Sequence, residues 1–158
     1  IVLLLLVYLG LLDAGTKVQQ GFATAYQVSE ETTDAGRNTA MSLSSVTVTA
    51  GGGRVDANLT NTGAKVIRLY GKVDLVVDYT DGSSVRRIKR LPYHASPQGA
   101  NEWTYTGISP DSRNPDLLDP QEVAALRVDL TPSMKSATSG VLTITTDGGA
   151  MARSTFSY

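Results

Sequence analysis

The first twelve residues of the chain are strongly apolar and carry no charge, and this stretch constrains the fold more than any other feature. Residues 1–12 read IVLLLLVYLGLL, and the first charged side chain is Asp13. So much contiguous apolar surface is not stable in water, because the burial of apolar side chains is strongly favourable. The segment therefore needs either lipid or copies of the same chain to cover it.

We expect the apolar start to belong to a long helix over residues 1–44. Beyond Asp13, apolar side chains recur at roughly helical spacing and continue a stripe along one side. A helix that is apolar all round indicates apolar surroundings on every side, such as a bilayer before assembly and a bundle of sister helices afterwards. The side chains expected to form the core of that bundle are Ile1, Val2, Leu3, Leu4, Leu5, Leu6, Val7, Leu9, Leu11, Leu12, Val18 and Phe22.

A secretory signal and a membrane anchor are two other interpretations of this segment. A secretory signal carries a basic stretch before its apolar core, and residues 1–12 hold no basic side chain, so we do not expect one. An apolar run of this length is also too short to cross a bilayer, which takes about 20 residues. A single membrane anchor truncated at its front stays open as the second interpretation, and the helical bundle is preferred.

The period of the sequence changes after residue 44. Stretches rich in β-branched residues follow, and turn signals separate them; the expected strands are residues 45–49, 54–60, 66–79, 84–91, 101–108, 121–130, 141–146 and 152–158. About seven or eight short strands at near-regular spacing are typical of an antiparallel β-sandwich. We therefore predict an α+β fold: a long N-terminal α-helix over residues 1–44, followed by an antiparallel immunoglobulin-like β-sandwich over residues 45–158.

The glycine triplet at residues 51–53 is interpreted as a hinge between the helix and the sandwich. It lacks the Lys-Ser/Thr pair of a phosphate-binding loop and does not open a helix. A phosphate site is therefore not expected there.

Composition argues against several functional classes. The formal net charge is -1, whereas a nucleic-acid-binding domain usually carries a basic excess. The chain has no Cys and one His, which excludes thiol chemistry and disfavours imidazole metal sites. His94 has no nucleophile arrangement near it in sequence, and no G-x-S-x-G motif occurs. We therefore expect no enzymatic activity, no cofactor and no nucleic-acid partner.

A basic strand is the most distinctive charged feature of the predicted sandwich. It carries Arg86, Arg87, Lys89 and Arg90. One interpretation is that these side chains make ion pairs with acidic side chains of a neighbouring subunit, namely Asp111, Asp116, Asp119 and Glu122. The other, weighted equally, is an edge strand whose charge prevents unwanted pairing.

Two further features point to sites of lower specificity. Asn58-Leu59-Thr60 is an N-glycosylation sequon, so Asn58 is a candidate modification site on an extracellular protein, with its occupancy left open. Asp74, Asp78 and Asp81 form either a solvated strand face or, as a minor alternative, a Ca²⁺ site.

Several short phrases resemble those of a known group of proteins. They are residues 55–63 (VDANLTNTG), a strand that ends in Val76-Val77-Asp78-Tyr79, and residues 117–122 (LLDPQE). With the apolar start, they resemble the archaeal flagellins (archaellins), which are type IV pilin-like filament subunits, and their accessory stator proteins. In these families a tNtG turn, a vDY strand and an ildPgE phrase recur in the extracellular domain. Position 121 departs from the pattern, since it is Gln where Gly is commoner.

The resemblance implies a structural subunit of an extracellular helical filament that serves motility. Such a subunit is cleaved by a prepilin-type peptidase just before the apolar stretch, is embedded in the membrane before assembly, and polymerises with copies of itself through its N-terminal helix. Secretion and motor machinery are the other implied partners. An adhesive archaeal type IV pilin and a membrane-anchored, stator-like sandwich that binds the cell-surface layer are the alternatives.

Overall fold

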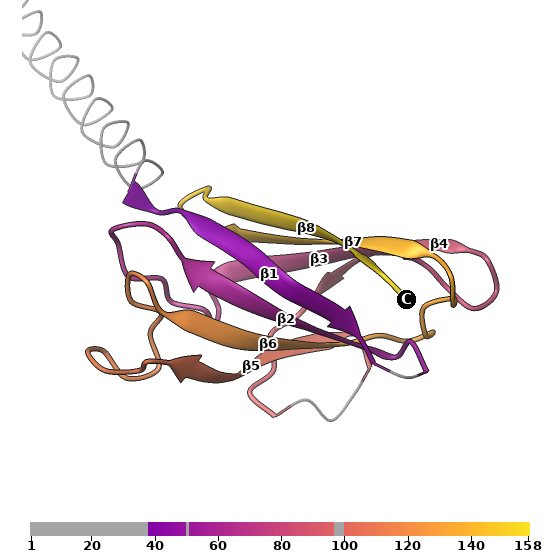
Figure 1. Cartoon of the computed structure of the whole chain (residues 1–158), viewed down its shortest axis with the longest axis horizontal. Coiled ribbons are helices and arrows are strands. Elements are labelled where there is room, and N and C mark those ends of the chain that lie inside the picture. The colour runs from indigo at the N-terminus through magenta and orange to yellow at the C-terminus, as the bar shows by residue number, and fades with distance from the viewer. Residues whose placement is uncertain (1–37, 50, 97–99) are drawn as a thin grey trace, which may run out of the picture. The chain divides into compact units, whose positions relative to one another are not determined.

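The computed structural model describes residues 38–49, 51–96 and 100–158, which form two four-stranded antiparallel sheets (Figure 1). The strands are β1 (Met41–Val48), β2 (Arg54–Asn61), β3 (Val73–Thr80), β4 (Arg86–Leu91), β5 (Glu102–Ser109), β6 (Val123–Asp129), β7 (Ser139–Thr146) and β8 (Met151–Ser157). The sheets have the strand orders β1-β2-β6-β5 and β4-β3-β7-β8. If β4 is counted as the extra strand C′, these orders read ABED and C′CFG, the arrangement of immunoglobulin-like sandwiches. All described residues belong to one compact unit, Gly36–Tyr158.

Alternation along each strand supplies one row of side chains to the core. In β2, Val55, Ala57 and Leu59 are buried, whereas Asp56 and Asn58 between them are half-buried on the outer face. Successive side chains of a strand point to opposite faces, so this pattern places the apolar row between the sheets. The largest fully buried side chains are Trp103, Tyr79, Leu59, Leu69, Leu75, Leu118, Leu126, Leu142, Ile144, Val55, Val77 and Val128.

The predicted α+β class is wrong, because the described residues are all-β. Residues 41–44, expected to continue a helix, are the start of β1, where Met41 pairs with Asn61 and Leu43 with Leu59. Met41 and Leu43 alternate with serines, which suits a strand, and β2 offers backbone partners that outweigh a local helical preference. The rest of the predicted helix lies outside the described residues. Within the described ranges, no helix is long and apolar enough to span a membrane.

The glycine triplet is not a hinge; it forms the turn of the β1–β2 hairpin. The amide of Thr49 donates to the carbonyl of Arg54 at 3.0 Å, and the amide of Gly52 donates to Thr49 at 3.0 Å. Gly52 has a φ of +68°, and a Cβ there would lie 2.4 Å from the carbonyl oxygen of Met134. Only glycine fits this left-handed position against the neighbouring backbone.

The long strand predicted over residues 66–79 is shorter in the structure. Strand β3 begins at Val73, and the chain between β2 and β3 passes from one sheet to the other. Ile67 makes an isolated bridge with Leu118, and Ile67 and Leu69 are buried in the core. Gly71, with a φ of +67°, turns the chain into β3.

Candidate interaction surface

Two of the phrases that carry the sequence resemblance meet in space at a buried junction around Asn61. The side chain of Asn61 is fully buried, and its Nδ2 donates to the carbonyl of Lys65 at 2.8 Å and to that of Leu118 at 2.9 Å. Its Oδ1 accepts from the amide of Gly63 at 3.0 Å. Backbone bonds join the same segments, since the amide of Gln121 donates to the carbonyl of Asn61 at 2.8 Å. The side chain therefore satisfies groups of both phrases, as buried polar groups require.

The acidic side chains of the second phrase are structural. Asp119 and Glu122 are buried, and each accepts hydrogen bonds from the surrounding loop. The carboxylate of Asp119 accepts from the amide and the side chain of Asn114 at 3.0 and 2.8 Å, and that of Glu122 accepts from the amide of Asp119 at 3.0 Å. Of the four acids predicted as partners for a neighbouring subunit, only Asp111 and Asp116 are exposed.

The turn after β2 anchors the chain as it enters the sandwich. The amides of Thr62 and Gly63 donate to the carbonyl of Ala40 at 2.9 and 3.0 Å. The amides of Ala64 and Lys65 donate to the carbonyl of Asn38 at 2.8 and 3.1 Å. A Cβ at Gly63 would lie 2.5 Å from the nitrogen of Ala40, so this position requires glycine for the backbones to approach.

The basic strand β4 forms ion pairs with the neighbouring strand β3 and the hairpin turn that follows it. Arg86 pairs with Asp78, Arg87 with Asp81, and Arg90 with Asp74. Lys89 donates instead to Asn101 Oδ1 at 2.9 Å and to the carbonyl of Thr131 at 2.6 Å. The three aspartates are thus engaged by different arginines and do not gather around a shared point, as a Ca²⁺ site would require.

The Asp81 carboxylate is the most enclosed member of this set. It accepts from the amides of Ser83 and Val85 at 2.9 and 3.0 Å and from Arg87 Nε at 2.8 Å. The hydrogen bond from Val85, with those from Arg87 and Ser83, lowers the pKa of Asp81 below its ordinary value of 3.8 despite its burial. The hydrogen bond from Arg86 likewise lowers the pKa of Asp78.

These pairs were missed at the level of sequence, although a signal existed. Asp74 and Asp78 are spaced to lie on one side of a strand, and Asp81-Gly82 is a hairpin signal in the sequence. Combining the two observations places the acidic strand antiparallel to the basic one, so that their charges face each other. Contacts of Arg86, Arg87, Lys89 and Arg90 with a neighbouring subunit stay a prediction.

The other predicted site residues divide between the two parts of the chain. The apolar core positions from Ile1 to Phe22 lie outside the described residues. Asn58 lies on the outer face of β2, opposite Ser44 of β1 and Ala125 of β6, and its side chain is half-buried. Its glycosylation stays a prediction.

A row of aromatic rings runs from the core to the surface at the β4–β5 side of the sandwich. Trp103 is fully buried and packs edge-to-face on Tyr93 at 5.1 Å between centroids. Tyr93 stacks on Tyr105 at 5.9 Å and lies 6.4 Å from Tyr70. Burial, with the neighbouring Tyr93, raises the pKa of Tyr105 to about 12. The rings are packed structural groups, and the Tyr105 hydroxyl stays protonated at neutral pH.

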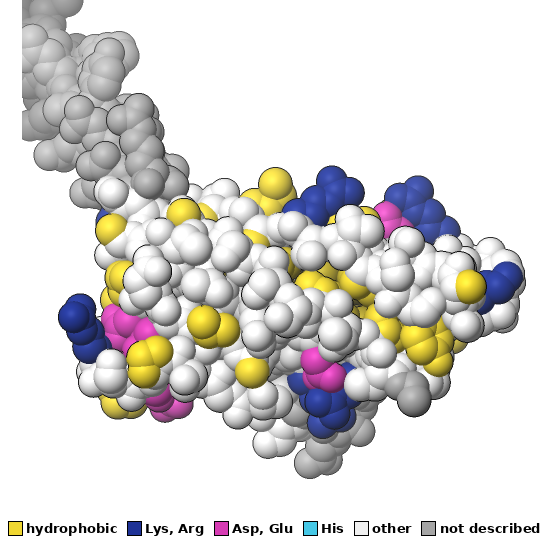
Figure 2. All heavy atoms as spheres, viewed as in Figure 1, with side chains coloured by type: hydrophobic (Ala, Val, Ile, Leu, Met, Phe, Trp, Pro, Cys, Tyr) yellow, Lys and Arg dark blue, Asp and Glu magenta, His cyan; other side chains and the backbone are white. Residues whose placement is uncertain are grey.

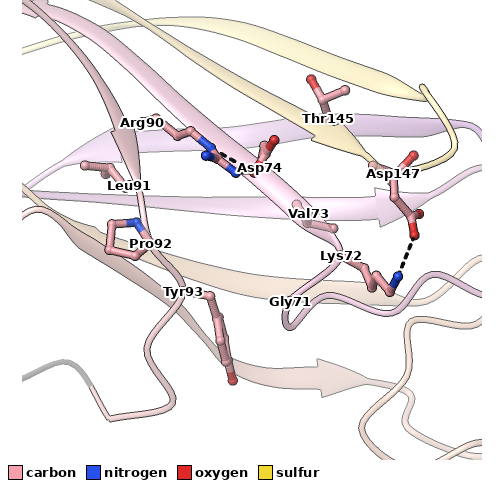
Figure 3. A pocket seen from close by; sticks show the side chains of 11 residues that line it. Gly71, Lys72, Val73, Asp74, Arg90, Leu91, Pro92, Tyr93, Thr145 and Asp147 are labelled. Carbon is pink, nitrogen blue, oxygen red and sulfur yellow. Dashed lines mark hydrogen bonds and ion pairs between the residues drawn. The ribbon is translucent and has the colours of Figure 1, made fainter.

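A cleft of about 600 Å³ opens where β3 begins and β4 and β7 end. Figure 3 shows two ion pairs at this cleft, Lys72 with Asp147 and Arg90 with Asp74. Tyr93 extends away from both pairs (Figure 3). Because the two cations are matched by two anions, the cleft has no excess charge to attract an ionic ligand.

The outer face of the sheet β4-β3-β7-β8 combines exposed apolar and cationic side chains. Ile88 on β4 and Met151 on β8 are each 62% exposed. Figure 2 shows Lys and Arg side chains along the upper edge of the molecule, over this sheet, with hydrophobic and acidic side chains beside them. Arg and Met are enriched in protein interfaces, so this face is the candidate interaction surface of the sandwich.

Comparison with known proteins places this arrangement among solved folds. No family model and no curated protein matches the sequence. Among solved structures, the archaellum periplasmic stator protein FlaG from Sulfolobus acidocaldarius matches with a TM-score of 0.56 and 19% identity, over 75% of this chain and 99% of that one. The chain shares its fold with archaellum proteins.

Two further structures agree with this likeness. The stator protein complex FlaF and FlaG from Sulfolobus acidocaldarius matches with a TM-score of 0.55 and 16% identity, over 73% of this chain and 87% of that one. The archaeal flagellum of Methanospirillum hungatei strain JF1 matches with a TM-score of 0.54 and 18% identity, over 99% of this chain and 88% of that one. At these identities the shared property is the fold.

Proposed function

We propose that the chain is a structural subunit of an archaellum-type filament. The observation that carries this proposal is the extent of the likeness to the Methanospirillum hungatei flagellum, which covers 99% of the chain, whereas the likeness to FlaG covers 75%. The role is mechanical and involves no catalysis.

The apolar residues 1–12 supply the reason for polymerisation. They need a cover of lipid or protein, and copies of the same segment provide one once the subunit has left the membrane. Burying large apolar side chains is worth about 1.5 to 3 kcal/mol each relative to water, but less relative to lipid, where they are already dry. Assembly therefore depends on packing between subunits and on the secretion machinery as well as on burial.

The sandwich forms the outer, extracellular part of the proposed filament. The hydrogen bonds from residues 62–65 to the carbonyls of Asn38 and Ala40 hold the chain where it enters the sandwich. Four backbone bonds in parallel resist a pull on the preceding segment better than one, so the turn is suited to transmit force. Cleavage by a prepilin-type peptidase and a stay in the membrane before assembly belong to the same proposal.

A stator-like role is the second candidate, and one observation favours it. FlaG matches over 99% of its own length with the higher TM-score, 0.56 against 0.54. In that role the sandwich binds a partner at the cell surface, and the apolar segment holds it to the membrane.

The deciding experiment is mass spectrometry of filaments sheared from the source cells and purified. We expect this chain to be a major component of the fibre, starting at or near Ile1.

A matched pair of variants tests the apolar segment: Leu6→Asp is expected to abolish incorporation, and Thr16→Asp to preserve it. Recovery of the chain only from the membrane fraction, with intact fibres made of other subunits, would replace the filament role with the stator-like one. A tethered-cell assay then distinguishes the two filament roles, because a motility filament rotates the cell and an adhesive pilus does not.

A further inference from the structure

The outer face of the sheet β4-β3-β7-β8 has the properties of a contact surface. Ile88 and Met151, each 62% exposed, are the most exposed large apolar side chains of the described residues. They stand on its two edge strands, and the half-buried Val76 and Val141 lie on the strands between them. The face therefore offers apolar area across its whole width, which a partner can cover.

The same face carries an uncompensated positive charge. Arg86 and Arg90 are paired with Asp78 and Asp74. Arg153, opposite Thr143 in the β7–β8 register, forms no ion pair within the part of the chain that the structure describes. The three arginines thus exceed the two aspartates by one. Arg153 acts on Asp78 through space, without direct contact, and lies two residues from Met151.

The complementary charge lies on another part of the molecule. Among the described residues, every acidic side chain without an ion pair falls between residues 102 and 122. The exposed ones are Asp111 and Asp116, in the loop between β5 and β6. This loop protrudes at the left end of the sandwich in Figure 1, where β5 ends and β6 begins, and both strands belong to the other sheet.

The loop is also preorganised, so it loses little conformational entropy when it binds a partner. Pro110 and Pro115 are exposed beside the two aspartates, and each fixes one backbone torsion. Asp119 and Glu122 hold the base of the loop through the hydrogen bonds described above. A preorganised loop that presents two apolar rings and two carboxylates matches a face that presents apolar side chains and guanidinium groups.

We propose that the β5–β6 loop of one copy docks on the outer face of the β4-β3-β7-β8 sheet of a second copy. This inference rests on the proposed filament function and names the contact between its outer domains. Pro115 packs on Met151, and Asp116 pairs with Arg153. Because the two patches differ, the contact is heterologous. A heterologous contact whose rotation does not close builds an open helical polymer, which the proposed filament requires.

Disulfide cross-linking in assembled fibres tests the contact, since the natural chain has no Cys. The double variant Met151→Cys/Asp116→Cys is expected to give a ladder of linked subunits after mild oxidation. The control Asp56→Cys/Asp116→Cys, with its first cysteine on the outer face of the other sheet, is expected to give monomers. Dimers from Met151→Cys alone would overturn the proposal, because they indicate a symmetric contact.

A second experiment, which exchanges the charges of Arg153 and Asp116, tests the contact if the cysteine variants do not assemble. Arg153→Asp and Asp116→Arg are each expected to lower the temperature at which fibres dissociate, and the combined exchange to restore it. The docking contact is overturned if assembled fibres of the cysteine variant give no ladder. It is also overturned if the combined exchange does not restore the dissociation temperature that each single variant lowers. Both outcomes leave the filament role intact. The absence of this chain from purified fibres of the natural protein overturns the filament role itself.

Discussion

The side-chain nitrogen of Asn61 lies 2.9 Å from the carbonyl oxygen of Leu118, a residue 57 positions further along the chain. This hydrogen bond joins the turn after β2 to the loop before β6. Through the neighbouring carbonyl of Lys65, the same nitrogen also closes the turn that holds residues 38–40. One amide group therefore connects the two phrases that distinguish the sequence and the segment that leads into the sandwich.

Replacement of Asn61 by Asp is expected to lower the free energy of unfolding by about 3 kcal/mol, because two donated hydrogen bonds are lost and a carboxylate faces two carbonyls. The measurement is the urea midpoint at constant slope. Asn58→Asp, on the outer face of the same strand, is the matched control and should change stability by about 0.5 kcal/mol or less. Equal effects at both positions would contradict the role given to Asn61.

Replacement of Gln121 by Gly is expected to stabilise the protein by about 1 kcal/mol. Gln121 has a φ of +70° and an exposed side chain, and a non-glycine residue in this region costs about 1 to 2 kcal/mol. Arg113→Gly, at an exposed position of the same loop without a positive φ, should destabilise instead. Calorimetric melting of both variants checks the sign.

Replacement of Gly63 by Ala is expected to cost about 2 kcal/mol or more, because the new methyl group meets the backbone of residues 38–40. Hydrogen exchange should also become faster at the amides of residues 62–65. Gly107→Ala is the control, since a Cβ there meets nothing within 4 Å and the φ is not positive. A Gly63 variant as stable as the Gly107 variant would show that the backbones do not approach as described.

The stability of the protein is expected to fall as the pH drops below 3.8, the ordinary pKa of an aspartate. Both Asp78 and Asp81 have a lowered pKa in the folded chain, so the unfolded chain binds more protons in this range. The contribution is fully present above that pH and is lost as the pH falls through the lowered values. Asp81→Asn should therefore be less stable than the natural chain at about pH 7 and converge with it at about pH 2. A difference that persists in acid would assign the loss to packing.

The strands show which features are readable without a structure. The alternation in residues 54–60 and 73–79 predicts one inward and one outward row of side chains, and the structure has both rows. Residues 41–44 were expected in a helix, and they pair with β2 because the open backbone of Leu59 and Asn61 is available to them. That partner is nearly twenty residues away in sequence, so a local pattern does not reveal it.

The candidate surface shows the same division. The run of four basic residues in β4 was evident from the sequence, but its aspartate partners on β3 and in the following turn become evident only with the hairpin register. Asp119 and Glu122 looked like surface acids, and their burial depends on the loop that folds over them.

The sequence by itself determined the sandwich, the turns and the need to cover residues 1–12, because apolar periodicity and turn chemistry act over a few residues. Only the tertiary structure decided which charges are satisfied within the chain and which stay free. Ion pairs depend on distances of a few ångström between strands, and those distances are set by register and packing. That is why Arg86 is paired with Asp78 while Arg153, on the same face, forms no ion pair among the described residues.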